Sequence, residues 1–222
     1  MSDWIDLTQP LDETCPTRPP GRPAPEFEQF ASVDEDGFNA TRLHLDTHCG
    51  THMDAPTHFL SPEEARTIDD VGVDEMLTEG VVLNVRDQPP ATALSVERLR
   101  EEADRRDLQS GDFVLLDFGN PPAPTDRYVH EYAYPSVEAA EYLVDRGVAC
   151  VATDALGVDA PGATIEEHAV HRTLLPADVR IVEGVANLAA VPAGRVDVVC
   201  TPIPYAGRDG SQVRLLVRPR EE

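Results

Sequence analysis

Lysine is absent from this sequence: all 18 basic residues are arginine, against 41 Asp and Glu, and the formal net charge is -23. Such a surplus of negative charge repels nucleic-acid phosphates and anionic membrane surfaces, so we expect neither as a partner. The acidic excess and the missing lysine together predict adaptation to concentrated salt, where screening over a few ångströms removes the self-repulsion of the folded state. An acidic protein from an arginine-favouring genome is the alternative interpretation.

Cysteine is also scarce, and Cys15, Cys49, Cys150 and Cys200 form no C-x-x-C pair. The sequence therefore signals neither a zinc ribbon nor a redox dithiol, and we expect free thiols in a reducing compartment. The first residues lack the basic region and the apolar stretch of a secretion signal, and no apolar run approaches membrane-spanning length. These absences predict a cytoplasmic protein.

Aromatic residues make up 5% of the chain, so its core must consist mainly of Val, Leu, Ile and Ala. A length of 222 residues favours one domain, residues 1–222, over two small ones. Prolines between Pro10 and Pro25 cannot sustain a helix or a central strand, which predicts a proline-rich N-terminal arm over about residues 8–40. Phe27, Phe30 and Phe38 give this arm apolar groups with which to dock.

Beyond residue 80, short β-branched runs alternate with helical patterns, which predicts an α/β fold. The expected strands are Val81 to Val85, Phe113 to Phe118, Val148 to Thr153, Val196 to Cys200 and Val213 to Val217. Expected helices begin at the caps Ser95, Ser136 and Thr164; the second ends at Gly147 and the third, opened by a capping box with Glu167, ends at Pro176.

From Arg42 to Asp54 the sequence reads RLHLDTHCGTHMD, and polar residues at even positions alternate with Leu, Cys and Met at odd ones. This alternation predicts a strand with one polar face and one core-facing side. A straight strand would hold His48 and His52 about 13 Å apart, too far for both to bind one ion. We therefore expect a bend or bulge at Gly50, after which Pro56 directs the chain back past the site.

His48, His52, Asp54 and His58 concentrate, within eleven residues, side chains that bind borderline metals. A solvated strand face is the alternative for His44 and Asp46, but such faces rarely carry this many histidines. Four of the seven histidines in the chain fall between His44 and His58. The segment therefore predicts a divalent-metal site.

The run from His48 to Phe59 resembles the H-x-G-T-H-x-D-A-P-x-H-F signature of the metal-dependent cyclase family, which includes bacterial kynurenine formamidases and isatin hydrolases. The resemblance spans most of the chain. It continues in residues Val151 to Asp154, Val158-Asp159, His171 to Leu175 and Ile181 to Leu188.

This resemblance implies a mixed, partly barrel-like β core flanked by helices, commonly assembled as a homodimer or homotetramer. It also implies one or two divalent ions, zinc or manganese. The implied ligands are His48, His52 and Asp54 for a first ion, with Asp54 able to bridge, and His171 and Glu183 for a second. His58 matches the family's general acid/base, outside the first coordination shell. His168, three positions before His171 on the same predicted helix, is expected beside the ligands or on the surface.

An ion held by imidazoles and a carboxylate lowers the pKa of bound water from about 15.7 toward about 7, which predicts water as the nucleophile. His58 can accept a proton from this water and pass it to the leaving group. The expected function is hydrolysis of a small amide, formamide, lactam or lactone. A non-hydrolytic metalloprotein, either a lyase or isomerase or a small-ligand binder, is the alternative. A structural metal is disfavoured, since structural zinc sites are usually closed by Cys and His.

One stretch departs from the kynurenine formamidase pattern. Where those enzymes typically carry Pro-x-Trp-Pro-Gly-Asp, residues 15–22 read CPTRPPGR, which places Arg18 near the aromatic position and Arg22 near the acidic one. Arginine there can bind a substrate carboxylate or be merely solvated on the arm.

Overall fold

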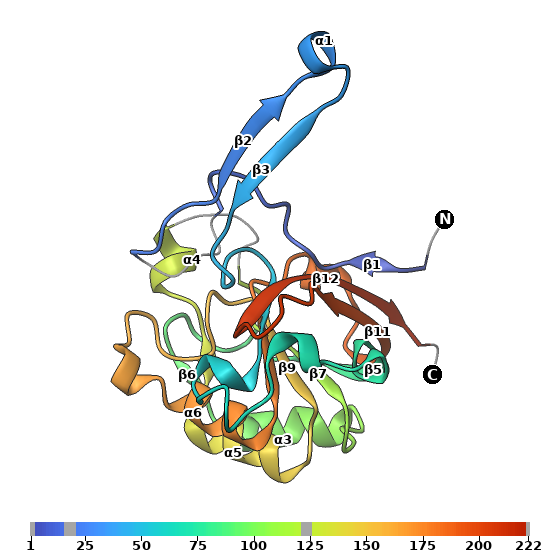
Figure 1. Ribbon diagram of the computed structural model, residues 1–222. Helices are drawn as coiled ribbons and strands as arrows, with labels where there is room; N and C mark the ends of the chain where they lie inside the picture. The colour runs from blue at the N-terminus through green and yellow to red at the C-terminus, as the bar shows by residue number, and fades with distance from the viewer. Residues whose placement is uncertain (1–2, 16–20, 121–125, 221–222) are drawn as a thin grey trace.

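The main β-sheet of the molecule is closed into a barrel. The protein is represented by a computed structural model, which describes residues 3–15, 21–120 and 126–220. The strands of its main sheet are β1 (Ile5–Asp6), β4 (His52–Asp54), β5 (Leu77–Asn84), β7 (Phe113–Asp117), β9 (Cys150–Thr153), β10 (Arg180–Glu183), β11 (Gly194–Pro202) and β12 (Gly210–Pro219). The order β12-β11-β5-β7-β9-β10-β4 closes where β4 pairs with β12, and β1 pairs farther along β12 (Figure 1). The predicted α/β fold with a mixed, barrel-like core is confirmed.

The barrel has a parallel and an antiparallel half. β5, β7, β9 and β10 are parallel neighbours, whereas β4, β11 and β12 join through antiparallel pairs. Side chains of the parallel strands alternate between two cores, because successive residues of a strand face opposite sides. Val82 and Leu115 belong to the core inside the barrel, and Val81 and Leu116 to the core beneath the helices.

Helices cover the outer side of the parallel strands, below the barrel in Figure 1. They are α3 (Val96–Arg105), α5 (Val137–Asp145) and α6 (Ala169–Leu174). Ser95 and Ser136 cap α3 and α5 as predicted, each side-chain oxygen accepting a backbone N–H of the first turn.

The remaining elements are short helices, two small strand pairs and 3-10 turns. The helices are α1 (Val33–Asp36), α2 (Val73–Met76) and α4 (Asp126–His130), and the strand pairs are β2 (Glu26–Ala31) with β3 (Ala40–His44) and β6 (Ala93–Leu94) with β8 (Tyr134–Pro135). The 3-10 turns are η1 (Pro56–His58), η2 (Ile68–Asp70), η3 (Ile165–Glu167), η4 (Leu175–Ala177) and η5 (Leu188–Ala190).

The five strands predicted beyond residue 80 correspond to β5, β7, β9, β11 and β12, with their ends moved by a few residues; β10 was not predicted. The continuous helix predicted from Thr164 to Pro176 is wrong. The capping box forms, with Thr164 N–H donating to Glu167 Oε2 at 2.9 Å, but it opens only the 3-10 turn η3. His168 then adopts a non-helical backbone, so α6 starts separately at Ala169.

A single strand from Arg42 to Asp54 is also wrong, because the chain leaves β3 at His44 and begins β4 only at His52. The predicted irregularity does occur at Gly50, whose φ of 72° lies in the left-handed region that glycine tolerates. Cys49 and Met53 are buried as expected, whereas Leu43 is 51% exposed because it lies on the β2–β3 hairpin.

The N-terminal arm does not wrap the surface over its whole length. Its second half forms the β2–β3 hairpin, which projects away from the barrel with α1 at its tip (Figure 1). Phe30 and Phe38 are 55% and 56% exposed, so the expectation that they dock on the rest of the chain is wrong. None of the four cysteines forms a disulfide, as predicted, and all four are buried. None of the helices in the described ranges is long and apolar enough to span a bilayer.

Candidate metal centre

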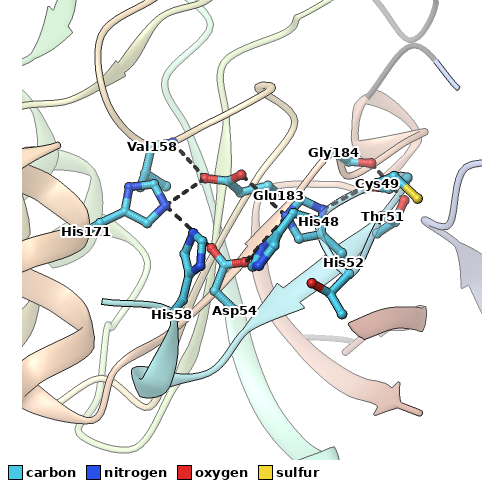
Figure 2. A network of polar contacts seen from close by, with 12 residues as sticks. His48, Cys49, Thr51, His52, Asp54, His58, Val158, His171, Glu183 and Gly184 are labelled. Carbon is cyan, nitrogen blue, oxygen red and sulfur yellow. Dashed lines mark hydrogen bonds and ion pairs between the residues drawn. The ribbon is translucent and has the colours of Figure 1, made fainter. Parts of the chain in front are cut away.

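Strand β4 carries two of the predicted ligands, and its position between β10 and β12 brings in a third. His52 is paired in register with Glu183 of β10, so both side chains leave the sheet on the same face. Asp54, two residues along β4, shares that face. His171 reaches the group from α6, and the close view shows His52, Asp54, His171 and Glu183 converging (Figure 2).

Both His52 and His171 are oriented by hydrogen bonds on the side away from this group. The Nδ1 atom of His52 lies 3.0 Å from the carbonyl oxygen of Gly50, and Nδ1 of His171 lies 2.5 Å from Asp159 Oδ2. Because a carbonyl or carboxylate oxygen accepts, Nδ1 carries a proton in each ring, and Nε2 is the nitrogen that can release its proton and bind an ion. This is how metal-binding histidines are commonly held.

The Nε2 atoms face two carboxylates at a spacing that suits an ion. His52 Nε2 lies 3.4 Å from Asp54 Oδ1 and 3.5 Å from Glu183 Oε2, and His171 Nε2 lies 3.5 Å from Asp54 Oδ2 and 3.4 Å from Glu183 Oε1. Two ligand atoms about 2.1 Å from one ion at a tetrahedral angle lie about 3.4 Å apart. Within the described residues, His52 Nε2 and Asp54 Oδ2 are buried and make no hydrogen bond. Such polar atoms are costly unless something binds them. His48, His52 and Asp54 offer ligand atoms that all lie within 4.8 Å of one another, so these three residues fit a divalent metal ion.

The charges of the buried histidines and carboxylates also favour a bound cation. Burial raises the pKa of Asp54, but the imidazoles of His48, His171 and His52 outweigh burial and hold that pKa well below its ordinary value. Burial lowers the pKa of His171, but Asp159, Asp54 and Glu183 raise it well above its ordinary value. Buried carboxylates therefore demand positive charge here, which protons on the imidazoles or a divalent cation can supply.

His48 lies in the turn before β4 and is held differently. Its Nδ1 lies 2.7 Å from Asp54 Oδ1 and its Nε2 lies 2.7 Å from Asp209 Oδ2. Burial lowers the pKa of His48, but these two carboxylates outweigh burial and raise it to about 10. Gly210 makes room for the ring: a Cβ there would lie 2.7 Å from the carbonyl oxygen of Met53 and 3.1 Å from His48 Cε1.

His58 ends the 3-10 turn η1 and stands at the edge of the group, with its side chain 17% exposed. Its ring centroid lies 3.9 Å from that of His48 and 5.8 Å from that of His171. His58 thus borders both the buried carboxylates and a cavity of about 360 Å³. Other residues along this cavity are Arg22, His48, Tyr132, Leu156, Asp159, Ala163, Ile165, His168, His171 and Glu183.

Asp209 and Asp159 belong to the site but were not predicted as site residues. Asp209 lies in the turn between β11 and β12, 3.4 Å from His58 Nδ1, and Asp159 holds His171. An Asp-Gly pair between two strands, such as residues 209–210, predicts a turn. It does not indicate that the aspartate takes part in a functional site. His168 is not on α6, yet its ring stacks on that of His171 at 5.3 Å between centroids. Arg18 lies outside the described residues.

The Cyclase family ("Putative cyclase") matches residues 5–160. The chain belongs to this family. The resemblance drawn from the His48 to Phe59 run is therefore confirmed. A kynurenine formamidase of Salinibacter ruber is 29% identical to this cyclase-family protein over 185 residues, 83% of this chain and 82% of the relative. A kynurenine formamidase of Bacillus thuringiensis is 26% identical over 220 residues, 98% of each chain.

Solved structures agree with this cyclase-family assignment. A protein described as a potential metal-dependent hydrolase with cyclase activity superposes with a TM-score of 0.78 at 26% identity, covering 99% of this chain and 98% of the other. Isatin hydrolase A from Labrenzia aggregata superposes with a TM-score of 0.87 at 22% identity, covering 96% of this chain and 92% of the other, which shows the shared fold.

Proposed function

We propose that this cyclase-family protein is a metal-dependent hydrolase of a small amide, formamide, lactam or lactone, with C–N bonds as its first targets. The observation that carries the proposal is the facing of two imidazole Nε2 atoms and two carboxylates at 3.4–3.5 Å beside a cavity. The kynurenine formamidase relatives support C–N bonds as targets.

His52, Asp54, His171 and Glu183 would hold the ion or ions, with His48 as a further ligand. Zinc or manganese, when bound, supplies Lewis-acid chemistry: it acidifies water and polarises a carbonyl. His48 would exchange its hydrogen bond to Asp54 or Asp209 for coordination. Gly50 and Asp159 keep the two Nε2 lone pairs directed at the group.

His58 moves the proton in this proposal. Its imidazole borders the cavity next to the metal group, by which we mean His48, His52, Asp54, His171 and Glu183. His58 can therefore take a proton from the attacking water and deliver one to the leaving nitrogen or oxygen. Asp209, 3.4 Å from Nδ1 of His58, favours a proton on that nitrogen and leaves Nε2 to act as the base.

The test is a panel of formamides, lactams and lactones assayed in concentrated salt with protein that has been stripped by a chelator and reloaded with zinc or with manganese. Turnover that depends on the added ion supports the proposal, and elemental analysis of the reloaded protein counts the ions. Metal binding without turnover on any member of the panel would favour the alternative, a non-hydrolytic lyase, isomerase or small-ligand binder.

The choice between zinc and manganese, the number of ions, the cytoplasmic location and a homodimer or homotetramer stay predictions. The projecting β2–β3 hairpin supports an assembly, because Phe30, Val33 and Phe38 are each more than half exposed on it. Light scattering at several protein concentrations measures the assembly directly.

A further inference from the structure

We propose that Arg22 is a specificity-determining residue, and that its guanidinium binds a carboxylate on the substrate while the substrate's scissile carbonyl lies at the metal group. This inference rests on the proposed hydrolase function and adds the chemical class of its substrate. Such a substrate is a small amide whose apolar body separates the scissile bond from an anionic group.

The guanidinium is held at the cavity by a carboxylate of the metal-bearing segment. Arg22 lines the cavity, and its Nη1 lies 3.0 Å and 2.9 Å from the two oxygens of Asp46. Asp46 also accepts the backbone N–H of His48 at 2.9 Å. Asp46 therefore ties the N-terminal arm to the turn that carries His48, and it fixes where the positive charge of Arg22 stands.

Donors remain on Arg22 for a ligand. Both hydrogen bonds to Asp46 leave from Nη1, and within the described part of the chain Nε and Nη2 make none. The Arg22 side chain is 41% exposed, whereas that of Asp46 is 14% exposed, so the pair is anchored on one side and open on the other. The remaining edge of the planar guanidinium, formed by Nε and Nη2, matches a carboxylate.

Arg22 places a positive charge on a cavity that is also lined by carboxylates, and this charge can attract an anionic ligand. Arg22 is the one arginine among the described residues that line the cavity, which also carries Asp159 and Glu183. The chain as a whole has a net charge of -23, so an anionic ligand approaches against repulsion unless a local cation attracts it. An arginine at the mouth is unfavourable for cationic ligands and suits anionic ones.

The wall beside Arg22 suits an apolar body. Leu156, Ala163 and Ile165 line the cavity, and Ile165 is 54% exposed. Tyr132 adds an aromatic ring near Glu183, since a Cβ on the intervening Gly157 would lie 3.3 Å from the Tyr132 hydroxyl and 3.6 Å from Glu183 Oε1. An aryl ring can thus pack between the metal group and Arg22.

The kinetic test compares formanilide, which is neutral, with its ortho, meta and para carboxylate analogues, the formamidobenzoates. For the wild-type protein loaded with metal, we expect at least one formamidobenzoate to have a KM about tenfold or more below that of formanilide. Arg22→Gln should abolish that preference, so that formanilide and the formamidobenzoates have similar KM values, and Arg22→Lys should restore part of it. Arg42→Gln removes the same charge from an ion pair with Glu28 on the hairpin and should leave the preference intact.

A binding test separates this inference from the proposed function. Calorimetry measures the affinity of metal-loaded protein for benzoate and for benzamide, with no turnover required. A carboxylate can also bind the ion itself, so the decisive comparison is wild type against Arg22→Gln. A preference for benzoate that Arg22→Gln removes supports the inference even if no amide is hydrolysed. A preference unchanged in Arg22→Gln, or absent from the wild type, overturns it.

Discussion

The imidazole of His48 is hydrogen-bonded to the carboxylate of Asp209, with 2.7 Å between Nε2 and Oδ2, although 161 positions separate the two residues. The contact joins the turn before β4 to the turn between β11 and β12. Asp209 also lies 3.4 Å from Nδ1 of His58, so one carboxylate touches both a proposed metal ligand and the proposed acid/base. It orients both rings without lining the cavity itself.

Replacing Asp209 by alanine should lower kcat/KM about tenfold to hundredfold, because residues that orient metal-binding histidines contribute on this scale. Metal affinity, followed by titration with a chromophoric chelator, should fall together with activity. Asp104→Asn on the exposed face of α3 is the control for loss of one negative charge. Wild-type kinetics in Asp209→Ala would show that the contact with His48 is incidental.

His58→Ala should reduce kcat by about a hundredfold or more, since general acid/base catalysis contributes roughly that much. Metal content measured by elemental analysis should stay at the wild-type level, because His58 is proposed to act outside the coordination shell. His44→Ala, at the exposed end of β3, is the matched histidine control. Loss of metal from His58→Ala would instead identify His58 as a ligand.

Metal should stabilise the fold. An ion present at about a hundred times its Kd raises the free energy of unfolding by about 2.7 kcal/mol, provided it binds the folded state alone. Thermal unfolding with and without chelator measures this difference. His52→Ala should abolish the metal-dependent rise in Tm, and the exposed His130→Ala should keep it. An equal rise in both variants would place the ion elsewhere.

Asp154 predicts a pH dependence that is independent of the metal group. Burial and the nearby Asp117 raise its pKa from 3.8 to about 7, although Asn120 donates two hydrogen bonds to it. Because the folded state binds this proton more tightly than the unfolded chain, the contribution to stability is full below about pH 4 and is lost as the pH rises to about 7.

Asp154→Asn removes this titration. In chelator-treated protein, the variant should gain stability over the wild type between about pH 5 and about pH 8, by an amount on the order of a few kcal/mol. Urea unfolding at each pH gives the difference. A constant difference across this range would contradict the raised pKa of Asp154.

The net charge of -23 predicts that lowering the salt concentration destabilises the protein. The Debye length grows from about 3 Å at 1 M to about 10 Å at 0.1 M, so repulsion among surface carboxylates is felt over longer distances. The Tm should fall between these concentrations of sodium chloride, and a neutral osmolyte should not restore it fully. Unchanged folding and activity after dialysis into low salt would refute the salt adaptation.

Local rules were sufficient for much of this protein. The types and spacing of His48, His52, Asp54 and His58 predicted a metal site, and the structure brings these side chains close together. Gly50 predicted the irregular backbone between the two histidines. Side-chain chemistry and left-handed glycine are properties of a few neighbouring residues, so local rules can find them. Capping serines and β-branched runs likewise predicted α3, α5 and five strands. Local rules did not predict strand β10 or the interruption of the strand between β3 and β4.

What tertiary structure decided was which distant residues meet. Glu183 faces His52 because β10 pairs with β4 in one particular register, and Asp209 reaches His48 because β12 closes the barrel against β4. Arg22 stands at the cavity because Asp46 holds it there. Strand register and barrel closure depend on the whole core packing at once, so no local pattern in the sequence encodes these contacts.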